Sequence, residues 1–180
     1  MGAHALSTAI HTKQVSCREV MAATLARIAQ INPSVNAIVS LRESDALMQE
    51  ADGYDALLEK GQSMGWMHGI PQAIKDLAPT EGLRTTMGSP LMHDFVPKED
   101  GLMVQRMKAA GCIVIGKTNV PEFGLGSHSF NPVFGATLNP YDLSKSAGGS
   151  SGGAAAALAT GMLCVADGSD FMGSLRNPAA

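Results

Sequence analysis

The sequence is poor in aromatic residues and in charge. Phe, Trp and Tyr make up 4% of its 180 residues, and charged residues make up 16%. The 13 Lys and Arg are outnumbered by 16 Asp and Glu, which gives a formal net charge of -3. Proteins that bind nucleic acid usually carry a basic patch and aromatic side chains on which bases stack. We therefore expect no nucleic-acid partner.

Long hydrophobic runs and paired cysteines are also missing. No apolar stretch reaches the roughly 18 residues that a membrane span needs, and the opening residues lack the pattern of a signal peptide. The three cysteines are far apart in the sequence and lie in apolar or helical segments, which favours reduced thiols over disulfides; they are Cys17, Cys112 and Cys164. No CxxC or paired His spacing indicates a metal. We expect a cytoplasmic protein without a membrane or metal partner.

The length and composition are those of one globular domain. Apolar residues make up 45% of the chain, and a domain of this size buries about 70% of the surface of its unfolded chain. The sequence pattern changes near residue 66, from polar helical segments to short apolar runs. We therefore expect a single domain over residues 1–180, with a helical region at 1–65 and the core at 66–180.

Two helices are predicted in the first region. Ser16 and Glu19 have the spacing of a capping box, which predicts a helix over residues 17–31 that ends before Pro33. A second, more polar helix is expected over 43–60, weakened by Gly53.

In the second region, short apolar runs alternate with segments that have a helical pattern. A strand is expected to end at Lys75, and a helix from Asp100 to Gly111 is followed by a buried strand at 112–115. A further helix at 150–160 precedes another expected strand at 163–166. This alternation predicts an α/β fold with a mixed, mainly parallel sheet flanked by helices.

Ligands of such sheets bind beyond the carboxyl ends of the strands. Three segments follow predicted strand ends directly: Lys75, Thr118 with Asn119, and residues 168–174. We expect these segments to meet at one edge of the sheet.

Residues 111–118, GCIVIGKT, satisfy the P-loop pattern GxxxxGK[ST]. A phosphate-binding loop follows a strand and opens a helix, whereas here the variable positions are themselves the predicted strand. Pro121 also interrupts any helix after Lys117. The context excludes a P-loop.

Residues 149–153, GSSGG, satisfy the nucleophile-elbow pattern around Ser151. That site needs an acid and then a histidine downstream of the serine. All the histidines lie upstream, at positions 4, 11, 68, 93 and 128. No such triad can be completed within this chain.

Two Gly/Ser loops and one lysine remain. Taken singly, Lys75 beside an Asp is typical of a surface pair, and a serine before an Ala-rich helix is typical of a cap. Taken together, they offer what cleavage of an amide needs: a serine nucleophile, a base and glycine-flanked amides for an oxyanion. A lysine at the end of a buried strand loses hydration, so its pKa falls and the neutral amine can act as a base.

These residues lie in sequence segments that resemble those of the amidase signature family. The matching blocks, in order, are GIPQAIKDL, GLRTTMGSP, GCIVIGKTNVPEFG, LNPYDLSKSAGGSSGG and ADGSDFMGSLRNPA. They cover about residues 69–180, and the N-terminal helices are also similar.

The resemblance implies a Ser, cis-Ser, Lys triad. Ser174 is then the nucleophile, Ser150 the bridging serine after a cis peptide bond, and Lys75 the base. The backbone amides of Phe171, Met172, Gly173 and Ser174 would form the oxyanion hole, with Ser151, Asp170 and Arg176 in supporting positions. No metal or organic cofactor is implied.

The sequence departs from the family at two points. Family members are much longer, so the resemblance implies a fold that is truncated after the nucleophile. Met172 also stands where the family has glycine. If φ is positive there, methionine is strained; if φ is negative, its side chain lines the acyl pocket.

The implied reaction is hydrolysis of a small-molecule carboxylic amide to a carboxylate and ammonia or an amine. One alternative is a non-catalytic or partner-dependent amidase fragment, and another is an amidotransferase subunit that supplies ammonia. An incomplete sheet leaves an open edge and uncovered apolar surface. We therefore expect the isolated chain to form a homo-oligomer or to bind a missing C-terminal half.

Overall fold

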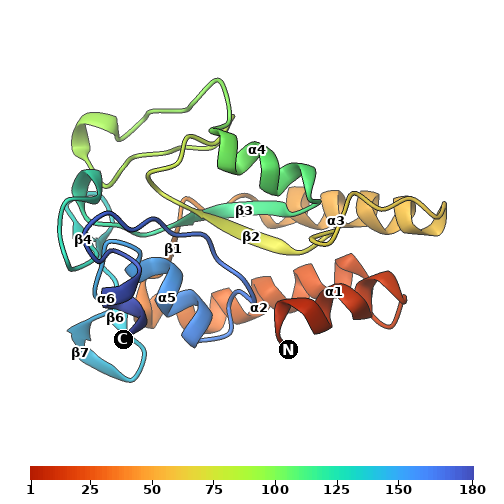
Figure 1. The fold of residues 1–180 in the computed structure, drawn as a ribbon, viewed down its shortest axis with the longest axis horizontal. Coiled ribbons are helices and arrows are strands. Elements are labelled where there is room, and N and C mark those ends of the chain that lie inside the picture. The colour runs from red at the N-terminus through yellow and green to blue at the C-terminus, as the bar shows by residue number, and fades with distance from the viewer.

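A three-stranded sheet lies at the centre of the computed structural model, which describes residues 1–180. Its strands are β1 (Ile38–Val39), β3 (Ile113–Thr118) and β2 (Pro71–Lys75), in that spatial order (Figure 1). β2 and β3 are parallel over five residue pairs, whereas β1 and β3 are antiparallel over two. The fold is α/β, as predicted, with a mixed sheet whose longer pairing is parallel.

Helices cover both faces of this sheet. They are α1 (Ala3–His11), α2 (Cys17–Val35), α3 (Ser44–Glu59), α4 (Leu102–Ala109), α5 (Gly152–Ala159) and α6 (Arg176–Ala179), with short 3₁₀ turns at Pro90–Met92 and Glu122–Gly124. Helix α4 lies on the opposite side of the sheet from α1, α2 and α5 (Figure 1). Two small hairpins complete the fold: β4 (Phe130–Asn131) with β5 (Gly135–Ala136), and β6 (Leu138–Asn139) with β7 (Asp142–Ser146).

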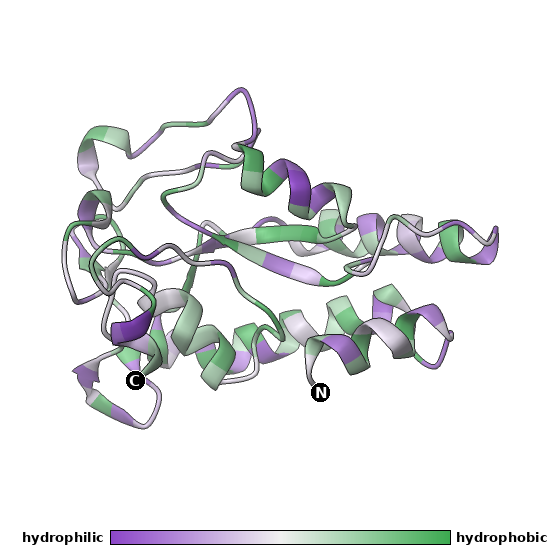
Figure 2. Ribbon diagram, viewed as in Figure 1, coloured by the Kyte–Doolittle hydropathy of each residue, from purple (hydrophilic) through white to green (hydrophobic).

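The strands are buried because they lie between these helical layers. Every residue of β2 and β3 is buried. In the hydropathy colouring, β3 is among the most apolar segments of the molecule (Figure 2). Burial on both faces explains why the first half of β3, residues 113–115, is a continuous apolar run rather than an alternating one.

The capping box at the start of α2 forms as predicted. Glu19 N donates to Ser16 Oγ at 3.0 Å, and Ser16 N donates to Glu19 Oε2 at 2.8 Å. The predicted end before Pro33 is wrong, since the helix continues to Val35. Asn36 ends it instead, because this residue is left-handed at φ 51° and donates its N–H to the carbonyl of Asn32.

The predicted helix at 43–60 is confirmed as α3, and the predicted end of α4 at Gly111 is also confirmed. Asp100, however, does not cap α4, whose N-cap is Gly101. Its carboxylate is already occupied, since it accepts from Glu81 N at 2.8 Å and from Lys108 Nζ at 2.7 Å.

The buried strand expected at 112–115 is confirmed as β3, but the strand expected at 163–166 does not form. The N–H groups of Met162 and Leu163 both turn back to the carbonyl of Ala157 at the end of α5. The amide of Leu163, the first residue of the expected strand, is thereby used and does not pair with a neighbouring strand. β2 therefore remains an edge strand.

Candidate active site

Lys75 is the last residue of β2 and its side chain is buried at 2% exposure. Its Nζ contacts three serine hydroxyls, those of Ser150 at 2.9 Å, Ser151 at 2.7 Å and Ser169 at 2.9 Å. The carbonyl oxygen of Ser169 is a fourth partner at 3.3 Å. All four partners are uncharged, so no carboxylate holds the ammonium directly. Lys75 is therefore no surface lysine paired to its neighbour.

Burial lowers the pKa of Lys75 from 10.5 to about 8. The negative charges of Asp167 and Asp170 act in the opposite direction but only partly offset the loss of hydration. The neutral amine is therefore well populated near pH 8. A neutral amine has the free lone pair that a general base requires.

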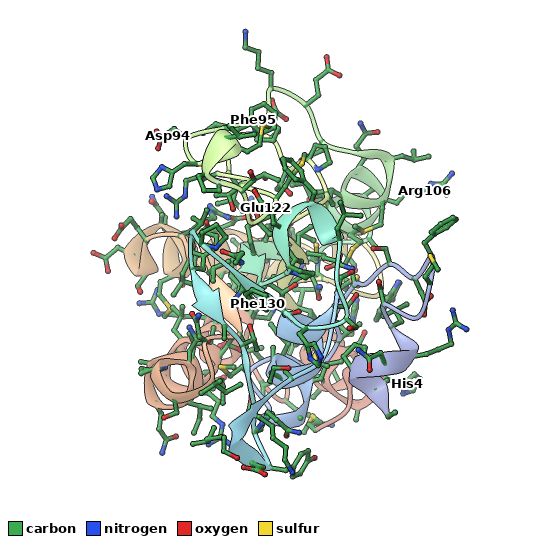
Figure 3. All side chains as sticks on the ribbon, turned by 90° about the vertical axis from the view of Figure 1, so that its left-hand side faces the viewer. His4, Asp94, Phe95, Arg106, Glu122 and Phe130 are labelled. Atoms are coloured by element: carbon green, nitrogen blue, oxygen red, sulfur yellow. The ribbon has the colours of Figure 1, made fainter.

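The serine loop before α5 holds its hydroxyls against this lysine. The peptide bond between Gly149 and Ser150 is cis. Ser129 Oγ donates to the carbonyl of Ser150 at 3.3 Å and accepts from Gly152 N at 3.0 Å. Both sides of the Ser150 turn are thus bound to a neighbouring loop. The loops that follow β3 form this end of the molecule, where Glu122 and Phe130 lie (Figure 3).

Close packing sets the position of α5. A Cβ added to Gly153 would lie 2.7 Å from the carbonyl oxygens of Ala37 and Asn119. Only glycine permits this approach, which also lets Gly153 N donate to Asn119 O at 3.1 Å. The start of α5, and with it the serine loop, is thereby fixed against the ends of β1 and β3.

Ser174 lies beside the serine loop. Its backbone carbonyl accepts from Ser151 N at 3.0 Å, and Asn177 Nδ2 donates to Gly149 O at 3.1 Å. The Ser174 hydroxyl makes no hydrogen bond within the chain, and Ser174 lines the same cavity as Ser150, of about 560 Å³. The structure therefore brings the three predicted triad residues to one site, with direct contact between Lys75 and Ser150.

The backbone amides before Ser174 differ in their availability. Gly173 N donates to Asp170 Oδ1 at 2.7 Å, so this amide is already engaged. The amides of Phe171, Met172 and Ser174 have no partner within the chain. Three of the four amides expected in an oxyanion hole are therefore free to receive a ligand.

Met172 does not adopt a positive φ, so the strained alternative is wrong. Gly173 carries the positive φ of this turn instead, at 109°. The Met172 side chain is 87% exposed and lines the cavity that holds Ser174. Its position fits the other alternative, a residue at the acyl pocket.

Asp170 stabilises the loop of residues 170–176, which carries Ser174. Its carboxylate accepts from the backbone N–H groups of Gly173, Leu175 and Arg176 and from two nitrogens of the Arg176 guanidinium. The paired guanidinium, together with these amides, holds the pKa of Asp170 well below its usual range. The Asp170 side chain is largely shielded, whereas that of Arg176 is 76% exposed.

Sequence reasoning missed Ser169 and Asp167. Both lie in the block ADGSDFMGSLRNPA, but neither has a spacing that indicates contact with Lys75. Ser169 supplies a hydroxyl to Lys75 Nζ, and both carboxylate oxygens of Asp167 accept from Lys75 N at 3.1 Å. The only signal was their place directly after a predicted strand.

Lys117, from the rejected P-loop pattern, is a second buried lysine. Its Nζ donates to Ala78 O at 2.7 Å and to Thr80 Oγ1 at 2.8 Å, and it contacts none of the serines. Burial lowers its pKa to about 8 as well. This lysine binds the loop after β2, in agreement with the exclusion of a phosphate site.

The cysteines, the metal-ligating residue types and the hydrophobicity of the helices complete the description of the chain. The cysteines are free thiols, and burial raises the pKa of Cys17 and of Cys112 to about 12. No group of His, Cys, Asp and Glu side chains has the arrangement of a metal site. None of the helices combines the length and the hydrophobicity of a membrane span.

Comparison with known families decides the relationship. The family model described as Amidase matches residues 19–180. The chain belongs to the amidase family. A glutamyl-tRNA(Gln) amidotransferase subunit from Alkaliphilus metalliredigens (strain QYMF) is 45% identical over 168 residues, which are 93% of this chain and 34% of that protein. The chain thus spans about a third of the length of the curated relatives it matches.

Solved amidase structures share the fold. A bacterial aryl acylamidase of the amidase signature enzymes matches with a TM-score of 0.93 at 34% identity, covering 100% of this chain and 37% of that one. The native peptide amidase from Stenotrophomonas maltophilia matches with a TM-score of 0.91 at 31% identity, covering 100% of this chain and 38% of that one. The architecture of this amidase chain is therefore that of amidase signature enzymes.

Proposed function

We propose that this amidase chain carries the nucleophile, bridging serine and base of an enzyme that hydrolyses carboxylic amides. The observation that carries the proposal is the contact of 2.9 Å between the buried Lys75 Nζ and Ser150 Oγ, at a cavity shared with Ser174. A buried amine of lowered pKa beside a serine relay is what activation of a serine without histidine requires. Ser151 and Ser169 support it by holding Nζ in place.

The proposed reaction begins with proton transfer. Neutral Lys75 takes the proton of Ser150, and Ser150 takes that of Ser174 as the Ser174 oxygen attacks the carbonyl carbon. The negative charge on the carbonyl oxygen is received by the free amides of Phe171, Met172 and Ser174. The C–N bond then breaks as Ser150 gives its proton to the leaving nitrogen and takes back the proton held by Lys75. Water hydrolyses the acyl-Ser174 ester to the carboxylate.

The test is covalent labelling. A fluorophosphonate probe should add once, at Ser174, because its hydroxyl makes no hydrogen bond within the chain, whereas the hydroxyls of Ser150 and Ser169 at the same cavity are bound to Lys75 Nζ. Intact mass and peptide mapping would show the adduct, and Ser174→Ala should abolish it. Ser127 lines the same cavity without contacting Lys75, so Ser127→Ala is the matched control and should label normally. Labelling that persists in Ser174→Ala would contradict the assignment.

The relatives favour a second candidate function. Curated proteins named as subunits of glutamyl-tRNA(Gln) amidotransferase are 42 to 45% identical to this chain, which suggests a polypeptide that releases ammonia from an amide for a partner enzyme. The cavity favours the first candidate, because its rim carries apolar side chains. They are Leu77, Phe123, Leu125, Phe171 and Met172. Asp170 is the one charged side chain at the cavity, and it is bound to Arg176.

Substrate choice distinguishes the two. We expect an uncharged anilide with an apolar acyl group to acylate Ser174 at least about tenfold faster than glutamine, since one methylene group packed against apolar side chains changes the rate by roughly 10- to 200-fold. Release of the aniline and release of ammonia measure the two rates on the same preparation. Faster turnover of glutamine would overturn the preference and support the amidotransferase role.

We also propose that the working protein buries the apolar groove beside α5. The groove has a volume of about 490 Å³ and includes Tyr141, Ala155, Leu158, Leu175 and Pro178. The further polypeptide that the longer relatives contain would cover it, since the chain spans about a third of their length and exposed apolar grooves of this kind are usually partnered.

A further inference from the structure

Asp167 occupies the open edge of β2. Strand β3 pairs with one side of β2, and no strand pairs with the other. On that open side both carboxylate oxygens of Asp167 accept the backbone N–H of Lys75 at 3.1 Å, and Gln72 Nε2 lies 3.4 Å from Oδ1. A side chain here performs the pairing that a neighbouring strand would otherwise provide. The end of β2 is thereby held at the residue that bears the amine.

The charge of Asp167 lies within reach of Lys75 without touching its Nζ. The charged side chains that influence the pKa of Lys75 are Asp167 and Asp170, and both favour its protonated form. Asp170 is neutralised by the guanidinium of Arg176, whereas no Arg or Lys side chain pairs with Asp167. Asp76, next in the chain, is instead held by Thr86 Oγ1 at 2.7 Å.

The surroundings of Asp167 from the other elements are also defined. Burial raises the pKa of Asp167, and the N–H of Lys75, the amide of Gln72 and the charge of Lys117 on β3 favour its ionised form. The negative charges of Asp76 and Asp167 in turn favour the protonated form of Lys117. Asp167 is thus a carboxylate placed near two buried lysines, of which only Lys75 contacts serines.

We propose that Asp167 is a positioning residue for Lys75: it fixes the backbone at the end of β2, and its negative charge sets the pH above which the Lys75 amine is free to act as a base. The second part rests on the proposed function. An opposite charge nearby favours the protonated lysine. Removing that charge should therefore move deprotonation of Lys75 to lower pH.

Titration of Lys75 tests this without any turnover. In protein with ¹⁵N-labelled lysine, the Lys75 Nζ signal is identified by its loss in Lys75→Met, and its midpoint is followed by NMR. Asp167→Asn keeps an oxygen acceptor for the Lys75 N–H but removes the charge. We expect its midpoint to lie lower by roughly one pH unit. Asp94→Asn, which removes an exposed carboxylate, is the matched control and should leave the midpoint unchanged.

The labelling rate of Ser174 gives the second readout. In Asp167→Asn, the rise of the rate with pH should shift to lower pH together with the NMR midpoint, which a purely structural role would not produce. If Asp167→Asn fails to fold, Asp167→Glu serves instead, and its retained charge should keep the midpoint within about 0.3 units of the original. A midpoint that is unchanged or higher in Asp167→Asn, or that falls in Asp167→Glu, overturns the proposal. Absence of labelling at every pH would count against the proposed function, while the NMR midpoint still decides the role of Asp167.

Discussion

Replacement of Lys75 by Met is expected to slow acylation of Ser174 by a fluorophosphonate by roughly 10²- to 10⁴-fold, the usual contribution of a general base. The substitution keeps the length of the buried stem and removes only the amine that contacts Ser150. In the unaltered protein, the rate should rise with pH and level off above about 8, because burial lowers the Lys75 pKa to about that value. Time courses of intact mass between pH 6 and pH 10 measure both effects.

Lys117→Met is the matched control for this loss. Lys117 is also buried and its pKa is also lowered to about 8, but its Nζ contacts Ala78 and Thr80 rather than a serine. This variant should keep acylation within about tenfold of the original rate, with circular dichroism to confirm that both variants are folded. Equal losses in the two variants would mean that Lys75 matters as a buried lysine and not as the base.

Asp170→Ala is expected to slow acylation by roughly 10²- to 10³-fold, the scale of losing one donor of an oxyanion hole. The carboxylate gathers the amides of Gly173, Leu175 and Arg176 around one point. Without it, the loop loses the bonds that shape the turn carrying Ser174. The free amides of the turn would then no longer converge on a carbonyl oxygen. The labelling rate and peptide mapping at Ser174 provide the measurement.

Arg176→Leu separates the loop contacts from the ion pair. Arg176 is 76% exposed, and exposed ion pairs contribute little. This variant keeps all three backbone contacts of Asp170, so its acylation rate should fall much less than that of Asp170→Ala. If Arg176→Leu is as slow as Asp170→Ala, the guanidinium rather than the loop geometry is what the site requires.

Local sequence patterns alone predicted a large part of the fold. Two predicted features depend only on residues a few positions apart: the capping box at Ser16 and Glu19, and the buried strand that ends at Lys75. The local sequence is therefore enough to predict them. The proposed chemistry of the site also began from residue types, since lysine and serine beside glycines indicate amide chemistry. Their roles came from the family resemblance and stay a prediction until labelling is done.

Other features required the folded chain. The strand expected at 163–166 does not form, and the amide of its first residue, Leu163, returns to the end of α5. That irregular path brings Asp167 to the edge of β2 and Ser169 to the amine of Lys75, contacts between residues more than ninety positions apart. Hydrogen bonds over such separations depend on how the elements pack, and packing has no signature in local periodicity. The sequence by itself determined the residue types and indicated the helices α2, α3, α4 and α5, whereas tertiary packing decided which side chains surround Lys75.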